Sequence, residues 1–187
     1  MDANAPLKIG TLVGSLRQGS YNAAIARALP ALAPAGVTIA ALPGIAGIPL
    51  YDADQQAKGF PTPVTVLADA IRGCHGIIIV SPEYNYSVPG VLKNAIDWVS
   101  RVPNQPFANK PVCLQSASMG PLGGARMQYH LRQIFVFLDA QMFNRPEVMV
   151  GTAQNKIDAA GTITDKATSD FIAGQLKAFA EFVRRVS

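Results

Sequence analysis

The sequence predicts an α/β fold in which five parallel strands form one sheet, with helices on both faces as a three-layer sandwich. Two observations carry this prediction. Short apolar segments, partly β-branched, alternate five times with longer segments of helical periodicity. Parallel neighbours also require crossover connections, which place helices on both faces of a sheet. The 187 residues, of which 49% are hydrophobic, favour a single domain, 1–187, with its own core.

The first half of the chain reads as three strands and two helices. The first strand is apolar and meets a polar loop at Gly14, and the helix after it carries Pro30 near its end. A long Gly-, Pro- and Asp-rich connection, 43–63, either carries function or only links two elements. The predicted elements are a strand at 7–13, a helix at 22–32, a strand at 37–42, a helix at 64–72 and a buried strand at 77–80.

The second half continues the alternation. Ser87 is expected to cap the next helix, on which Lys93, Asp97 and Arg101 share one face because they recur every four residues. The remaining predicted elements are this helix with its apolar stripe at 91–99, a strand at 111–115, a Gly/Ser loop at 116–124, a helix at 125–139, a strand around 148–150, and a closing helix with a stripe of Ile172, Leu176, Phe179, Val183 and Val186.

Five parallel strands favour the flavodoxin-like order 2-1-3-4-5. In that order the first and third strands flank the switch point of the sheet, and ligands bind beyond the carboxyl ends of the strands. The loops that follow strands one, three and four should therefore converge. These three loops also have the most unusual sequences of the chain.

The first of these loops, 14–22, has the composition of a phosphate site. It offers unpaired N–H groups at a helix start, two serine hydroxyls and the charge of Arg17. Ser20 and Tyr21 stand where a Walker loop needs Lys and Ser/Thr, and a G-x-G-x-x-G turn is missing, so a single terminal phosphate fits better than a triphosphate or a dinucleotide. Taken alone, the same residues could simply make a tight turn with Asn22 as the helix cap.

The second loop, S-P-E-Y-N-Y-S-V-P-G at 81–90, is stiffened by two prolines. A stiff loop can hold N–H groups towards a planar ligand, although an ordinary turn with packed tyrosines is the alternative. Together with G-S-L-R-x-x-S-x-N at 14–22 it resembles the NAD(P)H-dependent FMN reductase family, whose flavodoxin-like members include quinone, chromate and azo reductases. The resemblance runs from Leu7 onward and includes S-M-G-x-x-G-G-A-R at 118–126.

The resemblance implies an FMN site that is built from all three loops. The first loop would hold the phosphate and ribityl end, the second would line the isoalloxazine ring, and the third would lie beside the other edge of the ring, where missing side chains permit close backbone approach. The implied FMN-binding residues are Ser15, Arg17, Ser20 and Asn22 in the first loop, Pro82, Glu83, Tyr84 and Asn85 in the second, and Ser118, Gly120, Gly123 and Gly124 in the third.

The chemistry implied is that of the flavin, so no catalytic acid or nucleophile is expected from the protein. NAD(P)H would reduce FMN and leave, and a quinone, chromate or azo compound would then take its place in a ping-pong cycle. Tyr84 and Arg101 are candidate substrate-binding residues, with a surface pair between Arg101 and Asp97 as the alternative. The choice between NADH and NADPH stays open, because no second basic cluster identifies a 2′-phosphate site.

Other function classes find little support. The net charge is +4, but Lys and Arg are scattered, so nucleic acid is not an expected partner. Cys74 and Cys113 have no metal-site spacing, no apolar run is long enough for a membrane span, and a cytoplasmic location is expected. The segment 134–138 is apolar on nearly every side, which predicts a homodimer or homotetramer unless neighbouring loops cover it.

Two rival functions share the fold. A flavodoxin-type one-electron carrier without NAD(P)H oxidoreductase activity would also bind FMN, but such carriers are typically acidic and have a Thr-rich first loop. A phosphate-receiver or binding module is disfavoured because the third strand leads into Ser81 and Pro82 and not into an acceptor aspartate.

Overall fold

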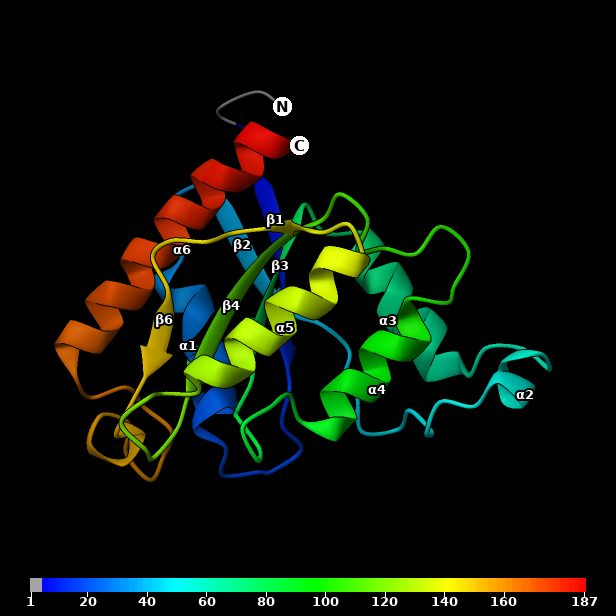
Figure 1. Cartoon of the computed structure of the whole chain (residues 1–187). Coiled ribbons are helices and arrows are strands. Elements are labelled where there is room, and N and C mark those ends of the chain that lie inside the picture. The colour runs from blue at the N-terminus through cyan, green and yellow to red at the C-terminus, as the bar shows by residue number, and fades with distance from the viewer. Residues whose placement is uncertain (1–4) are drawn as a thin grey trace.

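One parallel sheet organises the computed structural model, which describes residues 5–187, and helices cover both faces of the sheet (Figure 1). The strand order β2-β1-β3-β4-β5 confirms the flavodoxin-like prediction. The last position is divided, because β5 pairs with the start of β4 and β6 with its end. The strands are β1 (Leu7–Val13), β2 (Val37–Ala41), β3 (Gly76–Val80), β4 (Pro111–Ala117), β5 (Gln141–Met142) and β6 (Val148–Val150).

Two helices cover one face of the sheet and three cover the other. One hydrophobic core lies beneath α1 and α6, and a second lies beneath α3, α4 and α5. β3 supplies both cores, because Ile78 and Val80 face the first while Ile77 and Ile79 face the second. The helices are α1 (Tyr21–Leu32), α2 (Ala53–Gln56), α3 (Thr62–Arg72), α4 (Gly90–Val99), α5 (Ala125–Phe137) and α6 (Lys166–Val186), with a 3-10 turn η1 (Ala153–Asn155).

The long connection between β2 and α3 is fastened to α4. The Trp98 indole donates to the Pro49 carbonyl at 2.9 Å, and the Asn94 amide donates to the same oxygen at 2.8 Å. Asn94 also accepts from the Tyr51 N–H at 2.8 Å, and the Tyr51 ring meets Trp98 edge to face. These contacts give the connection a fixed path over α4.

The division between β5 and β6 coincides with a polar bridge from α6. Gln175 is buried, and its Nε2 donates to the Pro146 carbonyl at 2.7 Å. Its Oε1 accepts from Gln115 Nε2 of β4 at 2.8 Å. The side chain of Gln175 thus links α6 to β4 and to the segment between β5 and β6.

Several predicted boundaries need correction. Ser20, and not Asn22, is the N-cap of α1, so the helix begins one residue early. Ser87 does not cap α4, which starts after Pro89 without a side-chain cap. The Ser87 hydroxyl instead lies 3.0 Å from His130 Nδ1. β4 extends through Ala117, two residues further than predicted, and α5 ends at Phe137.

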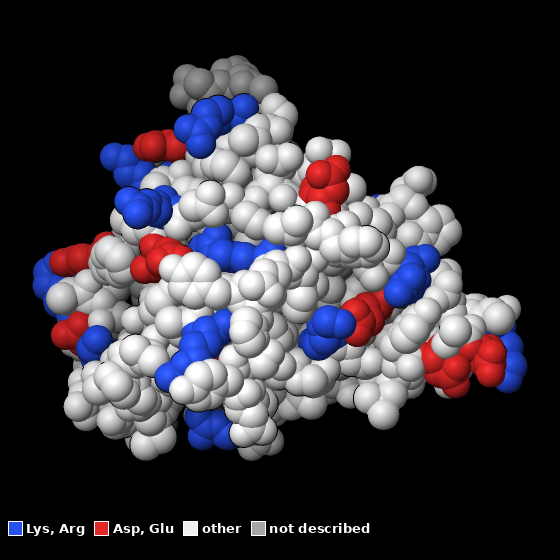
Figure 2. All heavy atoms as spheres, in the orientation of Figure 1, with Lys and Arg blue, Asp and Glu red and all other residues white. Residues whose placement is uncertain are grey.

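The surface charge is dispersed. On the face in Figure 2, lysines and arginines are separated by uncharged residues and several lie beside acidic side chains, so no continuous basic stretch forms there. In the part of the chain that the structure describes, no helix has the length and apolarity needed to cross a membrane.

Candidate functional site

The loops after β1, β3 and β4 meet at the carboxyl edge of the sheet, at the lower side of Figure 1. They enclose a cavity of about 160 Å³. Eight of the twelve predicted cofactor residues line it: Ser15, Arg17, Ser20, Asn22, Pro82, Glu83, Tyr84 and Ser118. Three residues outside the predicted set also line it: Tyr21, Ala117 and Met119. Each adjoins a predicted residue, which was the available signal.

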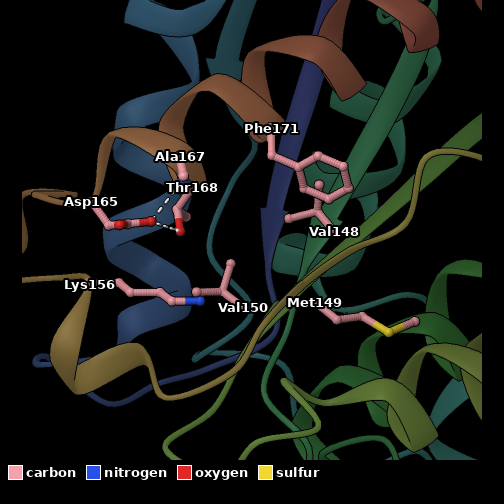
Figure 3. Close-up of a pocket in the computed structure, with 8 residues that line it drawn as sticks. All are labelled: Val148, Met149, Val150, Lys156, Asp165, Ala167, Thr168 and Phe171. Atoms are coloured by element: carbon pink, nitrogen blue, oxygen red, sulfur yellow. Dashed lines mark hydrogen bonds between the residues drawn. The ribbon is translucent and has the colours of Figure 1, made fainter.

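A larger hollow, of about 230 Å³, lies between β6 and the start of α6 (Figure 3). Its one carboxylate, Asp165, points at Thr168, whose N–H and hydroxyl donate to it at 2.8 and 2.6 Å. These two hydrogen bonds hold the pKa of Asp165 below its ordinary value. Asp165 is therefore occupied as the N-cap of α6, and the smaller cavity, with its polar groups from three loops, is the better candidate site.

The start of α1 presents hydrogen-bond donors to the cavity. Ser20 Oγ accepts from the Ala23 N–H at 3.3 Å, which satisfies the third donor of the first turn. Among residues 5–187, no acceptor binds the N–H groups of Tyr21 and Asn22, and both residues line the cavity. With the Ser15 hydroxyl and the exposed guanidinium of Arg17, these donors suit a dianionic phosphate.

Gly14 allows the first and second loops to approach each other. Its N–H donates to the Val80 carbonyl at 2.9 Å, which extends the pairing of β1 and β3 to the carboxyl ends of both strands. A Cβ at this position would lie 2.7 Å from the Ser81 Cβ and 2.9 Å from Leu92, inside normal contact distance. The glycine at the start of the phosphate loop is therefore required by packing.

Glu83 holds the second loop to α5. Its Oε2 accepts from the backbone N–H groups of Arg126 at 3.0 Å and Met127 at 3.2 Å, and its Oε1 pairs with Arg126 Nη1 at 2.8 Å. The N-cap of α5 is Gly124, which has no side chain to offer. A carboxylate from another loop thus caps the helix, so the charge of Glu83 is compensated inside the protein.

Tyr84–Ser87 is a two-residue hairpin. Tyr84 and Ser87 exchange N–H···O bonds of 3.0 Å, and both central residues have positive φ, 47° for Asn85 and 68° for Tyr86. Asn85 sits at the tip and is outside the cavity lining, unlike the neighbouring Tyr84, which is 48% exposed at the rim.

The third loop contributes fewer cavity residues than predicted. Gly120, Gly123 and Gly124 are outside the lining. Gly123 and Gly124 have φ of 59° and 88°, and Cβ atoms there would lie 2.5 Å from the Met149 carbonyl carbon and 2.9 Å from the Ser116 Cβ. The backbone therefore packs closely against the sheet at both positions, Gly123 against β6 and Gly124 against β4.

Arg101 does not join the other predicted residues. It lies beyond the C-terminal end of α4, where its guanidinium is 5.5 Å from the centroid of the Tyr51 ring. Asp97, the alternative partner of Arg101, pairs instead with Lys93 at 2.7 and 2.8 Å. Arg101 lines a separate hollow of about 280 Å³ together with Phe137 of α5.

The cavity, of about 160 Å³, is smaller than a typical small-molecule pocket of about 300 to 1,000 Å³, so it has room for only one end of a ligand of cofactor size. The donors at its inner end fit a phosphate, and the rim carries the exposed side chains of Tyr84 and Met119. In the described residues, no cluster of three His, Cys, Asp or Glu side chains could hold a metal ion.

Residues 7–155 match the family model described as NADPH-dependent FMN reductase. A quinone reductase from Escherichia coli strain K12 is 60% identical over 182 residues, which cover 96% of this chain and 97% of that protein. An NAD(P)H-dependent FMN reductase from Pseudomonas aeruginosa is 48% identical and covers 96% and 97%. The solved structure of FerB, a flavoenzyme NAD(P)H:(acceptor) oxidoreductase from Paracoccus denitrificans, superposes with a TM-score of 0.85 at 31% identity and covers 96% and 98%.

These comparisons confirm the predicted family, the flavodoxin-like fold and the class of enzyme, an oxidoreductase that uses FMN and NAD(P)H. The chain belongs to the NADPH-dependent FMN reductase family.

Proposed function

We propose that this single domain transfers two electrons from NAD(P)H to quinones through bound FMN. The observation that carries the proposal is the cavity at the carboxyl edge of the sheet, where phosphate donors and an aromatic rim belong to the same site. The overall reaction is balanced: NAD(P)H, a proton and a quinone give NAD(P)⁺ and a hydroquinone. The quinone reductase of E. coli, at 60% identity, supports this acceptor class.

The inner end of the cavity would hold the FMN phosphate. Ser15, Ser20 and Arg17 supply hydroxyls and a positive charge, and the first N–H groups of α1 complete the set. Asn22 would act chiefly by position, because its amide already bonds the backbone of Ala117 through both its oxygen and its nitrogen.

The ring would lie at the rim, along the second and third loops. Pro82 and Tyr84 would line it directly, while Glu83 fixes the loop by capping α5. Asn85 would shape the Tyr84–Ser87 hairpin through its positive φ. Ser118 and Gly120 would lie beside the other edge of the ring. When bound, FMN accepts a hydride and passes on two electrons, so the protein has to position it and leave one side open.

A single open side favours a ping-pong order. NAD(P)H and the oxidant would occupy the same space beside Tyr84 in turn, which also fits acceptors as different as quinones, chromate and azo compounds. Initial rates measured while both substrates are varied should give parallel double-reciprocal lines. Intersecting lines would show that both substrates bind together.

Self-association would cover the outer side of α5. Val136 is 75% exposed and Phe137 is 89% exposed, and both belong to the apolar segment that the sequence singled out. We expect a homodimer or homotetramer in sedimentation experiments. A Phe137→Lys variant should shift towards the monomer, and a wild-type chain that sediments as a monomer would contradict this expectation.

Purification with a visible spectrum, followed by anaerobic titration, tests the function. The enzyme should bind FMN, and one equivalent of NAD(P)H should bleach it directly by two electrons. A flavodoxin-type carrier would respond poorly to NAD(P)H and accumulate a one-electron form. Both cysteines are buried free thiols, which suits the reducing cytoplasm that we propose as its location.

A further inference from the structure

The third loop rests its back on β6 and on the turn that follows this strand. The Ser118 N–H donates to the Val150 carbonyl at 3.0 Å, and the Ser118 carbonyl accepts from the Ala153 N–H at 3.0 Å. The Gly120 carbonyl accepts from the Thr152 N–H at 3.2 Å. The other side of the same loop lines the cofactor cavity. The position of β6 therefore sets the position of this cavity wall.

One buried side chain joins the three elements around this loop. Gln128 lies in α5, and its Nε2 donates to Ser116 Oγ of β4 and to the Val148 carbonyl of β6, both at 2.8 Å. A backbone carbonyl can only accept, so the contact with Val148 fixes which way the amide faces. Gln128 and Ser116 are both fully buried. The amide thus connects the strand before the loop, the helix after it and the strand on which its back rests.

Gln128 occupies a position where packing alone would favour an apolar residue. The other buried side chains of α5, Met127, Leu131 and Phe135, are apolar and belong to the core beneath the helix. Among residues 5–187, no donor reaches Gln128 Oε1, and a buried acceptor without a partner destabilises the folded state. A side chain that makes two directed bonds while one of its own atoms stays unsatisfied is best explained by the geometry that it imposes.

We propose that Gln128 is a positioning residue that sets the distance between the third loop and the flavin ring. This inference rests on the proposed function, in which Ser118 and Gly120 lie beside one edge of the ring. Without the amide, the start of α5 would meet β4 and β6 through apolar contacts, which are not directional. The side-chain bonds of Gln128 lie away from the first loop, which supplies the phosphate donors, so its effect should fall on the ring end of the cofactor.

The test compares Gln128→Met with the matched control Gln175→Met, by fluorescence titration with FMN and with riboflavin, which lacks the phosphate. Both substitutions remove a buried glutamine amide that bonds a residue of β4, but Gln175 lies on α6, on the opposite face of the sheet and outside the cavity lining. We expect Gln128→Met to bind both flavins more weakly by the same factor, roughly threefold to tenfold, which corresponds to one ordinary hydrogen bond. Gln175→Met should bind both flavins as the wild type does.

The visible absorption spectrum of bound riboflavin is a second readout, because it responds to the surroundings of the ring. At saturating protein it should differ from the wild-type spectrum in Gln128→Met and match it in Gln175→Met.

Ser116→Ala carries the same test if Gln128→Met does not fold. It removes one partner of the amide and leaves the bond to Val148, so we expect a smaller loss of riboflavin affinity. In the Gln128→Met background the same substitution should add little, because the contact has already gone. Equal losses in both backgrounds would show that Ser116 acts independently of Gln128 and would overturn the network.

An unchanged riboflavin affinity and spectrum in Gln128→Met would overturn the positioning role. An equal loss in Gln175→Met would also overturn it, because stability alone would then account for the weakening, and a loss for FMN but not for riboflavin would place the effect at the phosphate. These outcomes differ from a failure of the proposed function. A wild-type protein that binds no FMN would overturn the function and this inference with it, whereas one that binds FMN but does not oxidise NAD(P)H would overturn the function alone.

Discussion

The Asn22 side chain bonds both backbone groups of Ala117: its Nδ2 donates to the carbonyl at 3.0 Å, and its Oδ1 accepts from the N–H at 2.8 Å. Asn22 lies in the first turn of α1, and Ala117 is the last residue of β4. One buried amide thus joins the helix that starts at the phosphate loop to the strand that leads into the third loop. The separation of these two walls of the cavity depends on this contact.

We expect Asn22→Ala to lower both stability and cofactor affinity. The variant leaves the N–H and C=O of Ala117 without their partner in a buried place, which costs about 2 to 3 kcal/mol of unfolding free energy. Urea unfolding measures this loss, and fluorescence titration should show weaker FMN binding. The exposed Asn155→Ala is the control, with an expected change below about 0.5 kcal/mol. Equal midpoints for the two variants would show that the Asn22 bridge contributes nothing.

Arg17→Ala should weaken the binding of FMN but not of riboflavin, which lacks the phosphate. Arg17 is exposed on the first loop, so its loss should leave stability unchanged, while one charge-assisted hydrogen bond accounts for roughly tenfold in FMN affinity. Quenching of flavin fluorescence gives both dissociation constants.

Arg185→Ala removes the same charge from the other end of the molecule, near the C-terminus of α6. It should bind FMN as the wild type does, because solvent and salt screen a distant exposed charge. Weakening of riboflavin binding in Arg17→Ala would show that Arg17 shapes the loop and does not contact the phosphate.

The two cysteines should make stability fall at alkaline pH. Burial raises the pKa of both thiols, most strongly that of Cys113. The native thiols therefore keep their protons above about pH 8.5, where thiols of the unfolded chain lose theirs, so rising pH favours unfolding. A Cys74→Ala/Cys113→Ala variant should lose less stability between pH 8 and pH 10 than the wild type. Parallel stability curves for the two proteins would contradict the shifted thiols.

The hydrophobic pattern and the loop motifs predicted the fold and most of the cavity-lining residues, because these features are encoded in short stretches of sequence. The fully apolar 77–80 became β3, and the three loops met where parallel topology requires. The long-range contacts were not predictable. Nothing in the sequence near Glu83 indicates that its carboxylate caps a helix that starts at residue 125. The path of the connection over Trp98 likewise depends on tertiary contacts.

The glycines of the third loop show the same limit. The glycines were expected to permit close approach of the backbone to the FMN ring, but sequence alone does not say which atoms lie against each glycine. Gly123 packs against the carbonyl of Met149 in β6, whereas a Cβ on Gly120 would meet nothing nearer than the Ser118 hydroxyl at 3.7 Å. Two glycines three positions apart in one motif therefore have different reasons to be glycine.

This difference predicts that alanine substitutions at the two glycines have different effects on stability. Gly123→Ala forces a Cβ into a left-handed residue and into the backbone of β6, and should cost about 2 to 4 kcal/mol of unfolding free energy. Gly120→Ala meets neither obstacle and should unfold at nearly the wild-type urea concentration. Because Gly120 is proposed to border the FMN ring, its alanine variant should retain stability but bind FMN more weakly than wild type. A stable Gly123→Ala would mean that the third loop is not anchored to β6.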